Sequence, residues 1–190
     1  MNKKYRGSWR SKDFDSLRCR AEQHHIPIIS PATQQFLGTL LQQIRPVQVL
    51  EIGTAVGYST CFLANQLIDR QWRISSFEVS APSYHTALCH RELLQARNSS
   101  IYHLDVLQAP LSNLGVYELD FVFVDGMKIQ YTAYLKAIRP YCIPGCVIVC
   151  DDIVSQQDKM ETLRPYLEKQ GLSHEIKHLT DGDGIVIIKT

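Results

Sequence analysis

The chain has 190 residues, a length that suits a single domain with a sizeable core. Its formal net charge of +1 excludes a strongly basic or strongly acidic protein that binds its partners through overall charge. No apolar run is long enough to span a bilayer and no signal-peptide pattern occurs, so we expect a cytoplasmic protein without membrane contacts.

The N-terminus carries an uneven share of the charge. The first twelve residues contain five basic side chains and no acidic one. We therefore divide the chain into a basic N-terminal arm, residues 1–20, and a single domain, residues 21–190. A frayed, solvated terminus explains such an arm, and contact with an RNA backbone is the alternative.

Helices and strands alternate along the rest of the chain. Ser30 followed by Pro31 predicts a helix start, and apolar residues at helical spacing continue the helix to Pro46. Further helices are predicted over residues 57–67, 81–96, 129–139 and 158–170, and strands over residues 47–51, 73–78, 100–104, 119–125, 146–151, 174–178 and 184–188. This order predicts an α/β fold, a doubly wound Rossmann-like sheet that is mostly parallel with an antiparallel strand near the C-terminus.

A glycine-containing turn follows the first predicted strand. Residues 49–59 read VLEIGTAVGYS, which is a strand, an acid, two glycines four apart and a helix start. Such turns lie at the edge of the sheet where α/β folds bind ligands. Gly53 suits the tight turn, and Gly57 is expected to bring the helix close to the ligand. Glu51 is predicted to lie at the lip of the crevice, where it would repel a pyrophosphate.

The turn does not match a dinucleotide fingerprint. In the pattern G-x-G-x-x-G that starts at Gly53, the second and third glycine positions hold Ala55 and Tyr58. A nucleoside without phosphates therefore fits better. Glu78, about twenty residues after the turn, is expected to accept hydrogen bonds from ribose hydroxyls unless it is an ordinary surface residue. Asp105 either faces an adenine edge or a nearby loop amide, or is an ordinary turn residue.

Acidic residues end two later strands. Asp125 follows one, and Asp151 and Asp152 follow the other. Three carboxylates at one sheet edge repel each other unless a cation lies between them, and oxygen ligands suit Mg²⁺ or a similar ion. The alternative is that Asp151 and Asp152 cap a turn. Lys128, beside this cluster, is expected to be less basic than usual and to accept a proton from a substrate hydroxyl.

The six cysteines do not indicate a metal site. Three of them fall on predicted helix or strand positions among apolar neighbours, so we expect buried thiols rather than disulfides. Cys142, Cys146 and Cys150 recur every four residues, but Pro144 and Gly145 interrupt them, so they do not share a helical face.

Taken together, five segments resemble the cation-dependent, S-adenosylmethionine (SAM)-dependent O-methyltransferases. That family includes catechol and caffeoyl-CoA O-methyltransferases and bacterial enzymes that methylate 5-hydroxyuridine in tRNA. The segments are LEIGTAVGYS at residues 50–59, HHIPI at 24–28, DFVFVDGMK at 120–128 with Tyr131, PGCVIVCDD at 144–152 and GDG at 182–184. The segment at 24–28 is most similar to the tRNA-modifying branch.

The resemblance implies a methyl donor site, a metal site and a catalytic pair. The cofactor-binding residues that it implies are Ile26, Glu51, Gly53, Val56, Gly57, Ser59, Glu78, Asp105, Val106 and Asp125. It implies that Asp125, Asp151 and Asp152 bind Mg²⁺ or Mn²⁺, and that Lys128 acts with Asp125 in catalysis. The implied reaction is in-line transfer of the sulfonium methyl group to an acceptor hydroxyl. A homodimer is a further expectation from the family.

Three departures concern the acceptor side. Asp152 stands where the family usually has asparagine, the segment after it is short, and the N-terminal helices are expected to be reduced to a basic stub. We therefore expect either a tRNA 5-hydroxyuridine or a small catechol-like acceptor. The alternatives are a catalytically inactive SAM-binding protein and a nicotinamide-dependent oxidoreductase; the missing glycines and Glu51 argue against the latter.

Overall fold

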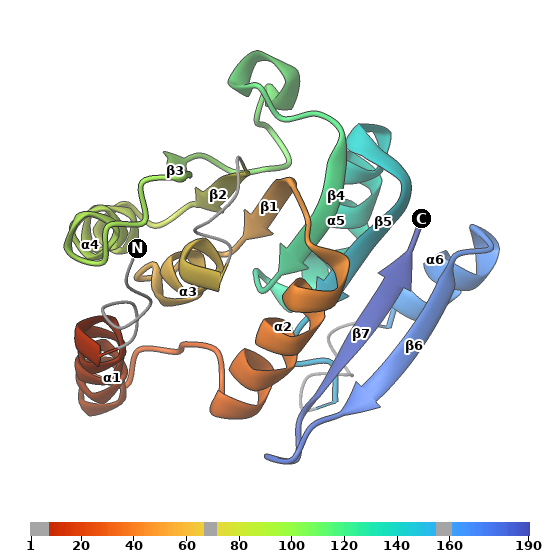
Figure 1. The fold of residues 1–190 in the computed structure, drawn as a ribbon. Helices are drawn as coiled ribbons and strands as arrows, with labels where there is room; N and C mark the ends of the chain where they lie inside the picture. Colours follow the sequence, from red (N-terminus) through yellow and green to blue (C-terminus); the bar gives the residue numbers. More distant parts are fainter. Residues whose placement is uncertain (1–7, 67–71, 155–160) are drawn as a thin grey trace.

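The computed structural model describes residues 8–66, 72–154 and 161–190, with side chains from residue 13 onward. The described strands form one seven-stranded sheet in the order β3-β2-β1-β4-β5-β7-β6 (Figure 1). The strands are β1 Gln48–Ile52, β2 Arg73–Glu78, β3 Ser99–His103, β4 Leu119–Val124, β5 Cys142–Cys150, β6 Ser173–His178 and β7 Gly184–Lys189. The helices are α1 Ser8–Gln23, α2 Pro31–Ile44, α3 Tyr58–Gln66, α4 Ala81–Leu93, α5 Tyr131–Ile138 and α6 Leu163–Lys169, and the 3₁₀ turns are η2 Leu111–Leu114, η3 Lys128–Gln130 and η4 Arg139–Tyr141.

Strand directions confirm the predicted fold class. The pairs β2–β3, β1–β2, β1–β4 and β4–β5 are parallel. Strand β7 runs antiparallel to both of its neighbours, β5 and β6. The sheet is therefore Rossmann-like, with one reversed strand near the C-terminus as predicted.

Apolar residues of β4 build a core on both faces of the sheet. Phe121 and Phe123 pack with side chains of α2 and α3, whereas Val122 and Val124 pack with those of α5 and α6. All four side chains are fully buried. Helices α5 and α6 accordingly lie on the opposite side of the sheet from α2 and α3 (Figure 1). The consecutive apolar run in the sequence is explained by burial on both faces.

Helix α1 is a feature that the sequence analysis missed. We predicted no helix before residue 30 and an N-terminal stub, but α1 spans Ser8–Gln23. Leu17 and Ala21 of α1 are buried, and the Phe14 ring meets the edge of Tyr58 with 5.7 Å between centroids. Spacing of these three apolar residues by three and four positions was the available signal. The proposed division into arm and domain stays a prediction, and residues 1–7 lie outside the described part of the chain.

Other boundaries differ by a few residues. Strand β5 begins at Cys142 rather than 146, because Pro144 and Gly145 lie within an irregular part of the strand and not before it. Helix α6 begins at Leu163, and residues 158–160 of its predicted start are not described. The predicted Ser30 cap is confirmed, since its hydroxyl accepts a 3.0 Å hydrogen bond from the Thr33 amide. Among the described helices, none is long and apolar enough to cross a membrane.

The turn after β1 places Gly53 against the end of β4. Its φ of +97° lies in the region that favours glycine. A Cβ built at this position would lie 2.2 Å from the carbonyl oxygen of Asp125. The amide of Gly53 donates to the Phe77 carbonyl at 3.1 Å. The ends of β1, β2 and β4 therefore meet at one point of the sheet edge.

Replacing Gly53 with alanine is expected to destabilise the protein by about 2–4 kcal/mol, because the methyl group clashes with backbone and the positive φ is strained. Urea unfolding of the ligand-free protein measures the effect. Gly171→Ala is the matched control, because Gly171 also has positive φ (+61°) but no atom within 4 Å of its Cβ position. We expect about 1 kcal/mol for this control. Equal losses in the two variants would contradict the close packing at Gly53.

Candidate functional site

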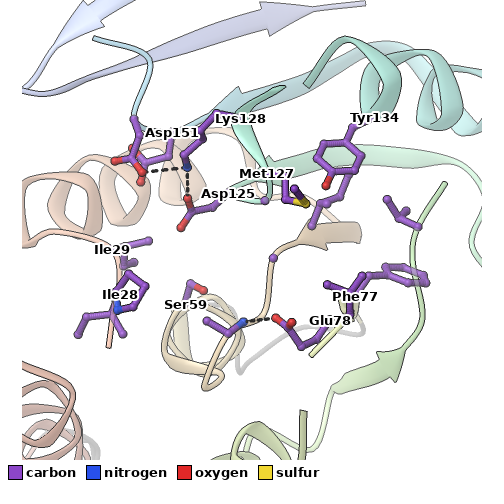
Figure 2. Close-up of a pocket in the computed structure, with 18 of the residues that line it drawn as sticks. Ile28, Ile29, Ser59, Phe77, Glu78, Asp125, Met127, Lys128, Tyr134 and Asp151 are labelled. Carbon is purple, nitrogen blue, oxygen red and sulfur yellow. Dashed lines mark hydrogen bonds and ion pairs between the residues drawn. The ribbon is translucent and has the colours of Figure 1, made fainter. Parts of the chain in front are cut away.

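A cavity of about 420 Å³ opens at the carboxyl edge of the parallel strands (Figure 2). It is lined by residues that follow β1 to β5 and by the segment 27–30 that leads into α2. Figure 2 shows Glu78 on one side of this cavity and the Lys128–Asp125 pair on the other. The location is the one at which open α/β sheets bind ligands.

Glu78 is held at one side by backbone amides. Its Oε2 accepts a 2.7 Å hydrogen bond from the Ala55 amide, and its Oε1 accepts one of 2.7 Å from the Ser80 amide. The residue is only 8% exposed, yet it lines the cavity. Each carboxylate oxygen keeps a further lone pair. The carboxylate is thus fixed in place to accept hydrogen bonds from a diol.

Glu51 does not lie at the lip of the crevice, and this expectation was wrong. Its side chain is fully buried, and its Oε2 accepts hydrogen bonds from the hydroxyls of Thr60 and Ser76. Side chains alternate along a strand, so the residue directs its carboxyl toward α3 rather than into the cavity. Burial raises the pKa of Glu51 to about 7, although the hydroxyls of Ser59, Ser76 and Thr60 oppose this shift.

Asp125, Asp151 and Asp152 form an acidic side of the cavity, and Lys128 lies among them. Its Nζ lies 2.6 Å from Asp125 Oδ1 and 2.8 Å from Asp152 Oδ2. It also donates to the Tyr131 hydroxyl at 2.9 Å. Tyr131 in turn is placed to donate to the carbonyls of Val124 and Asp151, at 3.1 and 3.0 Å. Hydrogen bonds therefore connect the first turn of α5 to the ends of β4 and β5.

The charge state of Lys128 differs from our expectation. Burial disfavours the ammonium, but the carboxylates of Asp125 and Asp152 outweigh it and raise the pKa of Lys128 above its ordinary value. Lys128 is therefore not the weakened base that the sequence suggested. In this structure it is an ammonium that donates hydrogen bonds.

Asp151 is the buried member of the acidic group. It is 3% exposed, and its Oδ1 accepts a 3.2 Å hydrogen bond from the hydroxyl of Thr33 in α2. Burial and the charges of Asp125 and Asp152 raise the pKa of Asp151 to about 8. The pKa of Asp125 is also raised by burial, against the opposing effect of Lys128. The single ammonium therefore does not compensate all three carboxyls, and Asp151 is mostly protonated at neutral pH.

The donor chemistry of this side fits a hard divalent cation, because three carboxylates converge on one region with a single ammonium among them. The arrangement is not a ready-made ligand set, however. Within the described ranges, no group of three His, Cys, Asp or Glu side chains is positioned to hold a metal ion. The ammonium of Lys128 lies between Asp125 and Asp152. A divalent cation bound to these carboxylates would therefore compete with Lys128.

Most predicted site residues line the cavity. Those that do are Gly53, Ser59, Glu78, Asp105, Val106, Asp125, Lys128, Asp151 and Asp152. Asp105 also accepts a 2.9 Å hydrogen bond from the Leu107 amide, as a turn residue would. The exposed rim includes Asp152, whose φ of +56° is a conformation that aspartate and asparagine tolerate.

Four predicted cofactor residues do not line the cavity: Ile26, Glu51, Val56 and Gly57. Val56 belongs to the buried core. Gly57 instead allows α3 to approach α4, because a Cβ there would lie 3.0 Å from that of Ala87. Ile26 is tied back to α1 through its amide and the Ala21 carbonyl, at 2.8 Å.

The sequence analysis assigned no role to several large apolar residues that line the cavity. They include Ile28, Ile29, Tyr58, Phe77, Met127 and Tyr134. Ile28, Tyr58 and Met127 lie within segments that resemble the O-methyltransferases, and Phe77 directly precedes Glu78. These positions were the available signal.

Comparisons with known proteins agree with the fold. A profile of the family described as "Methyltransferase domain" matches residues 50–153. Catechol O-methyltransferase of Niastella koreensis is 29% identical over 132 residues, which cover 66% of this chain and 58% of that protein. Caffeoyl-CoA O-methyltransferase of Stellaria longipes is 27% identical over 151 residues, covering 75% of this chain and 61% of that protein. The matched segments thus span about three fifths of these relatives.

Solved structures share the fold. The O-methyltransferase from Bacillus cereus, in complex with SAH, superposes with a TM-score of 0.80 at 23% identity and covers 94% of this chain and 91% of its own. The O-methyltransferase TomG from Streptomyces achromogenes, in complex with SAM, gives a TM-score of 0.77 at 21% identity, with 94% and 89% covered. At such identities the likeness concerns the fold.

The buried Glu51 generates a prediction about pH and stability. Its folded-state pKa of about 7 lies above the ordinary value of 4.5. A raised carboxyl pKa means that the folded protein binds the proton more tightly, so stability is full below pH 4.5 and is lost as pH rises to about 7. The loss amounts to about 3 kcal/mol.

Glu51→Gln is expected to remove this pH dependence, so that the variant gains stability relative to the natural protein as pH rises. Urea unfolding at a series of pH values measures the difference. The control is Glu175→Gln, since Glu175 is exposed on β6. A constant difference between Glu51→Gln and the natural protein at every pH would contradict the buried, shifted carboxyl.

Proposed function

The chain belongs to the methyltransferase domain family, and from this premise we propose that it transfers a methyl group from SAM to a hydroxyl oxygen of its acceptor. One observation carries the proposal. The carboxylate of Glu78, which backbone amides hold in place, and a charged cluster around Lys128 lie on opposite sides of one cavity. Such a cavity can hold a nucleoside at one side and an acceptor at the other.

The charge of the lining supports SAM as the cofactor. Of the described lining residues, Lys128 is the one cation, whereas five are acidic. A sulfonium and an amino group suit this excess of negative charge, and the pyrophosphate of a nicotinamide dinucleotide does not. Glu78 would accept the ribose hydroxyls. Phe77 and Val106 would cover the adenine and exclude water from it.

A divalent cation is the second proposed cofactor. Asp125, Asp151 and Asp152 would hold it. The raised pKa of Asp151 supports this assignment, because it shows that the carboxyl lacks a cation that would stabilise its ionised form. When bound there, a divalent cation supplies positive charge that favours the deprotonated form of an acceptor hydroxyl. An aspartate at 152 adds a negative charge to this ligand set.

The residues of the chain act by positioning and by charge. In the reaction the bond between the methyl carbon and sulfur breaks while a bond from that carbon to the acceptor oxygen forms, and the electron pair of the broken bond stays on sulfur. Glu78 fixes the donor through its ribose. Lys128 lies beside Asp125 and Asp152 in the absence of a cation, and its ammonium would neutralise negative charge on the acceptor oxygen before it attacks. Alignment of donor and acceptor is expected to supply most of the rate enhancement.

The acceptor is proposed as a flat ring that carries a hydroxyl next to a second oxygen. Catechol and 5-hydroxyuridine of tRNA both meet this description. The catechol O-methyltransferase relative supports the small molecule. The tRNA proposal rests on residues 24–28 and on the basic N-terminus. Of these residues, Pro27 and Ile28 line the cavity.

Glu78→Gln is expected to weaken SAM binding about tenfold or more, because a charge-assisted hydrogen bond to a diol contributes about 1.5–3 kcal/mol. Isothermal titration calorimetry measures the dissociation constant. Glu175→Gln, on the exposed face of β6, is the control and should bind like the natural protein. An unchanged constant in Glu78→Gln, with normal unfolding, would show that the ribose lies elsewhere.

Methyl transfer to catechol and to total tRNA, measured with radiolabelled SAM, tests the activity. We expect transfer to one of them, and a loss of at least about tenfold on addition of EDTA, with recovery in excess Mg²⁺ or Mn²⁺. Asp151→Asn should lose activity in both conditions, whereas Glu175→Gln should not. Activity indifferent to EDTA would refute the metal proposal. SAM binding without transfer to either acceptor would contradict the proposed reaction and support the alternative of an inactive SAM-binding protein.

A further inference from the structure

The pairing of strand β5 with β4 is irregular near the start of β5, at the edge of the sheet opposite the cavity. Leu119 of β4 pairs with Cys142, and Phe121 pairs with Val147. Two residues along β4 thus match five residues along β5, so β5 has three extra residues between the two paired positions. Residues two apart in a strand are separated by about 6.7 Å. The irregularity therefore brings Cys142 close to the residues around 147.

The segment between the paired positions is a closed loop. Gly145 turns the chain with φ of +84°, and its amide donates to the Thr190 carbonyl at 2.8 Å. The Thr190 amide donates to the Cys146 carbonyl at 3.1 Å, and the Thr190 hydroxyl donates to the Ile143 carbonyl at 2.9 Å. The C-terminal residue thus holds both ends of the loop in place.

The loop brings two thiols together on one face of the sheet. Cys146 belongs to the core between the sheet and α5, and Cys142 packs against that same core. The Cys142 thiol lies 3.6 Å from the Ile138 carbonyl, and the neighbouring Cys146 thiol lowers the pKa of Cys142. Both cysteines are free thiols. Cys142 and Val147 pair with β4 residues that are two apart, so they are separated by about 6.7 Å along the sheet, and Cys146 is adjacent to Val147. Disulfides join residues whose Cα atoms lie within about 6.8 Å.

We propose that Cys142 and Cys146 form a redox-active dithiol that a peroxide converts into an intrastrand disulfide. The sulfur of Cys142 attacks one peroxide oxygen, the O–O bond breaks, and one water leaves after taking a proton. The sulfur of Cys146 then attacks the resulting sulfenic acid, an S–S bond forms and a second water leaves. Two thiols thus lose two electrons in total, and these reduce the peroxide to two waters.

The surroundings assign the order of these steps. Cys142 is partly exposed and Cys146 is fully buried, so a peroxide reaches Cys142 first. Cys146 and the charge of Arg139 lower the pKa of Cys142, against the opposing effect of burial. A thiolate is the reactive form of cysteine. Cys146 is then the adjacent thiol that resolves the sulfenic acid.

The other four cysteines lie on other elements or away from the loop. Cys19 and Cys89 are exposed on α1 and α4. Cys61 on α3 and Cys150 at the end of β5 are buried, and burial raises the pKa of Cys150 above its ordinary range. The dithiol therefore lies within a single loop.

Mass spectrometry of the full chain tests the proposal. The protein is treated with hydrogen peroxide, free thiols are blocked with N-ethylmaleimide after denaturation, and the digest is fragmented. After peroxide treatment, we expect the segment to carry no maleimide label on Cys142 or Cys146 and to be two hydrogen atoms lighter than the reduced, unlabelled segment. Reduction with dithiothreitol before blocking should restore labelling of both cysteines. Cys150 in the same segment should keep its label.

Variants provide the matched controls. Cys142→Ala and Cys146→Ala should each abolish the linked species, while Cys150→Ala should retain it, with circular dichroism as the check on folding. The natural protein alone also decides the question. A disulfide between other cysteines, or Cys142 oxidised to sulfinic acid while Cys146 stays labelled, would overturn the proposal. Oxidation confined to Cys19 or Cys89 would overturn it as well.

Discussion

The ammonium of Lys128 between the carboxylates of Asp125 and Asp152 is the interaction on which the rest of the site depends. Strands β4 and β5 are parallel neighbours, so the acids that follow them must meet at one edge of the sheet. Without a cation, these acids would repel each other in a buried setting. Lys128 and Tyr131 bind both strand ends and thereby fix the start of α5. The same acids form the region at which we expect the acceptor hydroxyl to be activated.

The opposite side of the cavity is organised by neutral contacts. Backbone amides hold Glu78, and Gly53 lets the turn after β1 lie against the end of β4. On the acidic side, Thr33 connects the start of α2 to Asp151, over 118 residues of sequence. The proposed donor and acceptor regions thus lie along one edge of the sheet. Positioning of two reactants is what methyl transfer needs most, since no covalent intermediate with the protein is involved.

The sequence was sufficient to predict the sheet and most of the polar site, because strand ends converge wherever an α/β sheet forms. Glu78 and Asp125 were found by this reasoning. Glu51 was misplaced because an acid next to a glycine turn looks exposed, whereas strand alternation directs it inward to Thr60 and Ser76. The basicity of Lys128 was misjudged because it depends on two partners whose distances the sequence does not contain. Helix α1 was missed because its apolar residues are few among many charges.

A crystal structure of the protein with SAH and Mn²⁺ tests the central claim most directly, because manganese is located by its anomalous scattering. The account predicts a manganese peak among Asp125, Asp151 and Asp152, with Lys128 displaced from its bridge and the SAH ribose hydroxyls on Glu78. A structure with bound SAH but no manganese, and with Lys128 still between Asp125 and Asp152, would contradict the metal assignment. SAH bound away from Glu78 would contradict the assignment of the cavity itself.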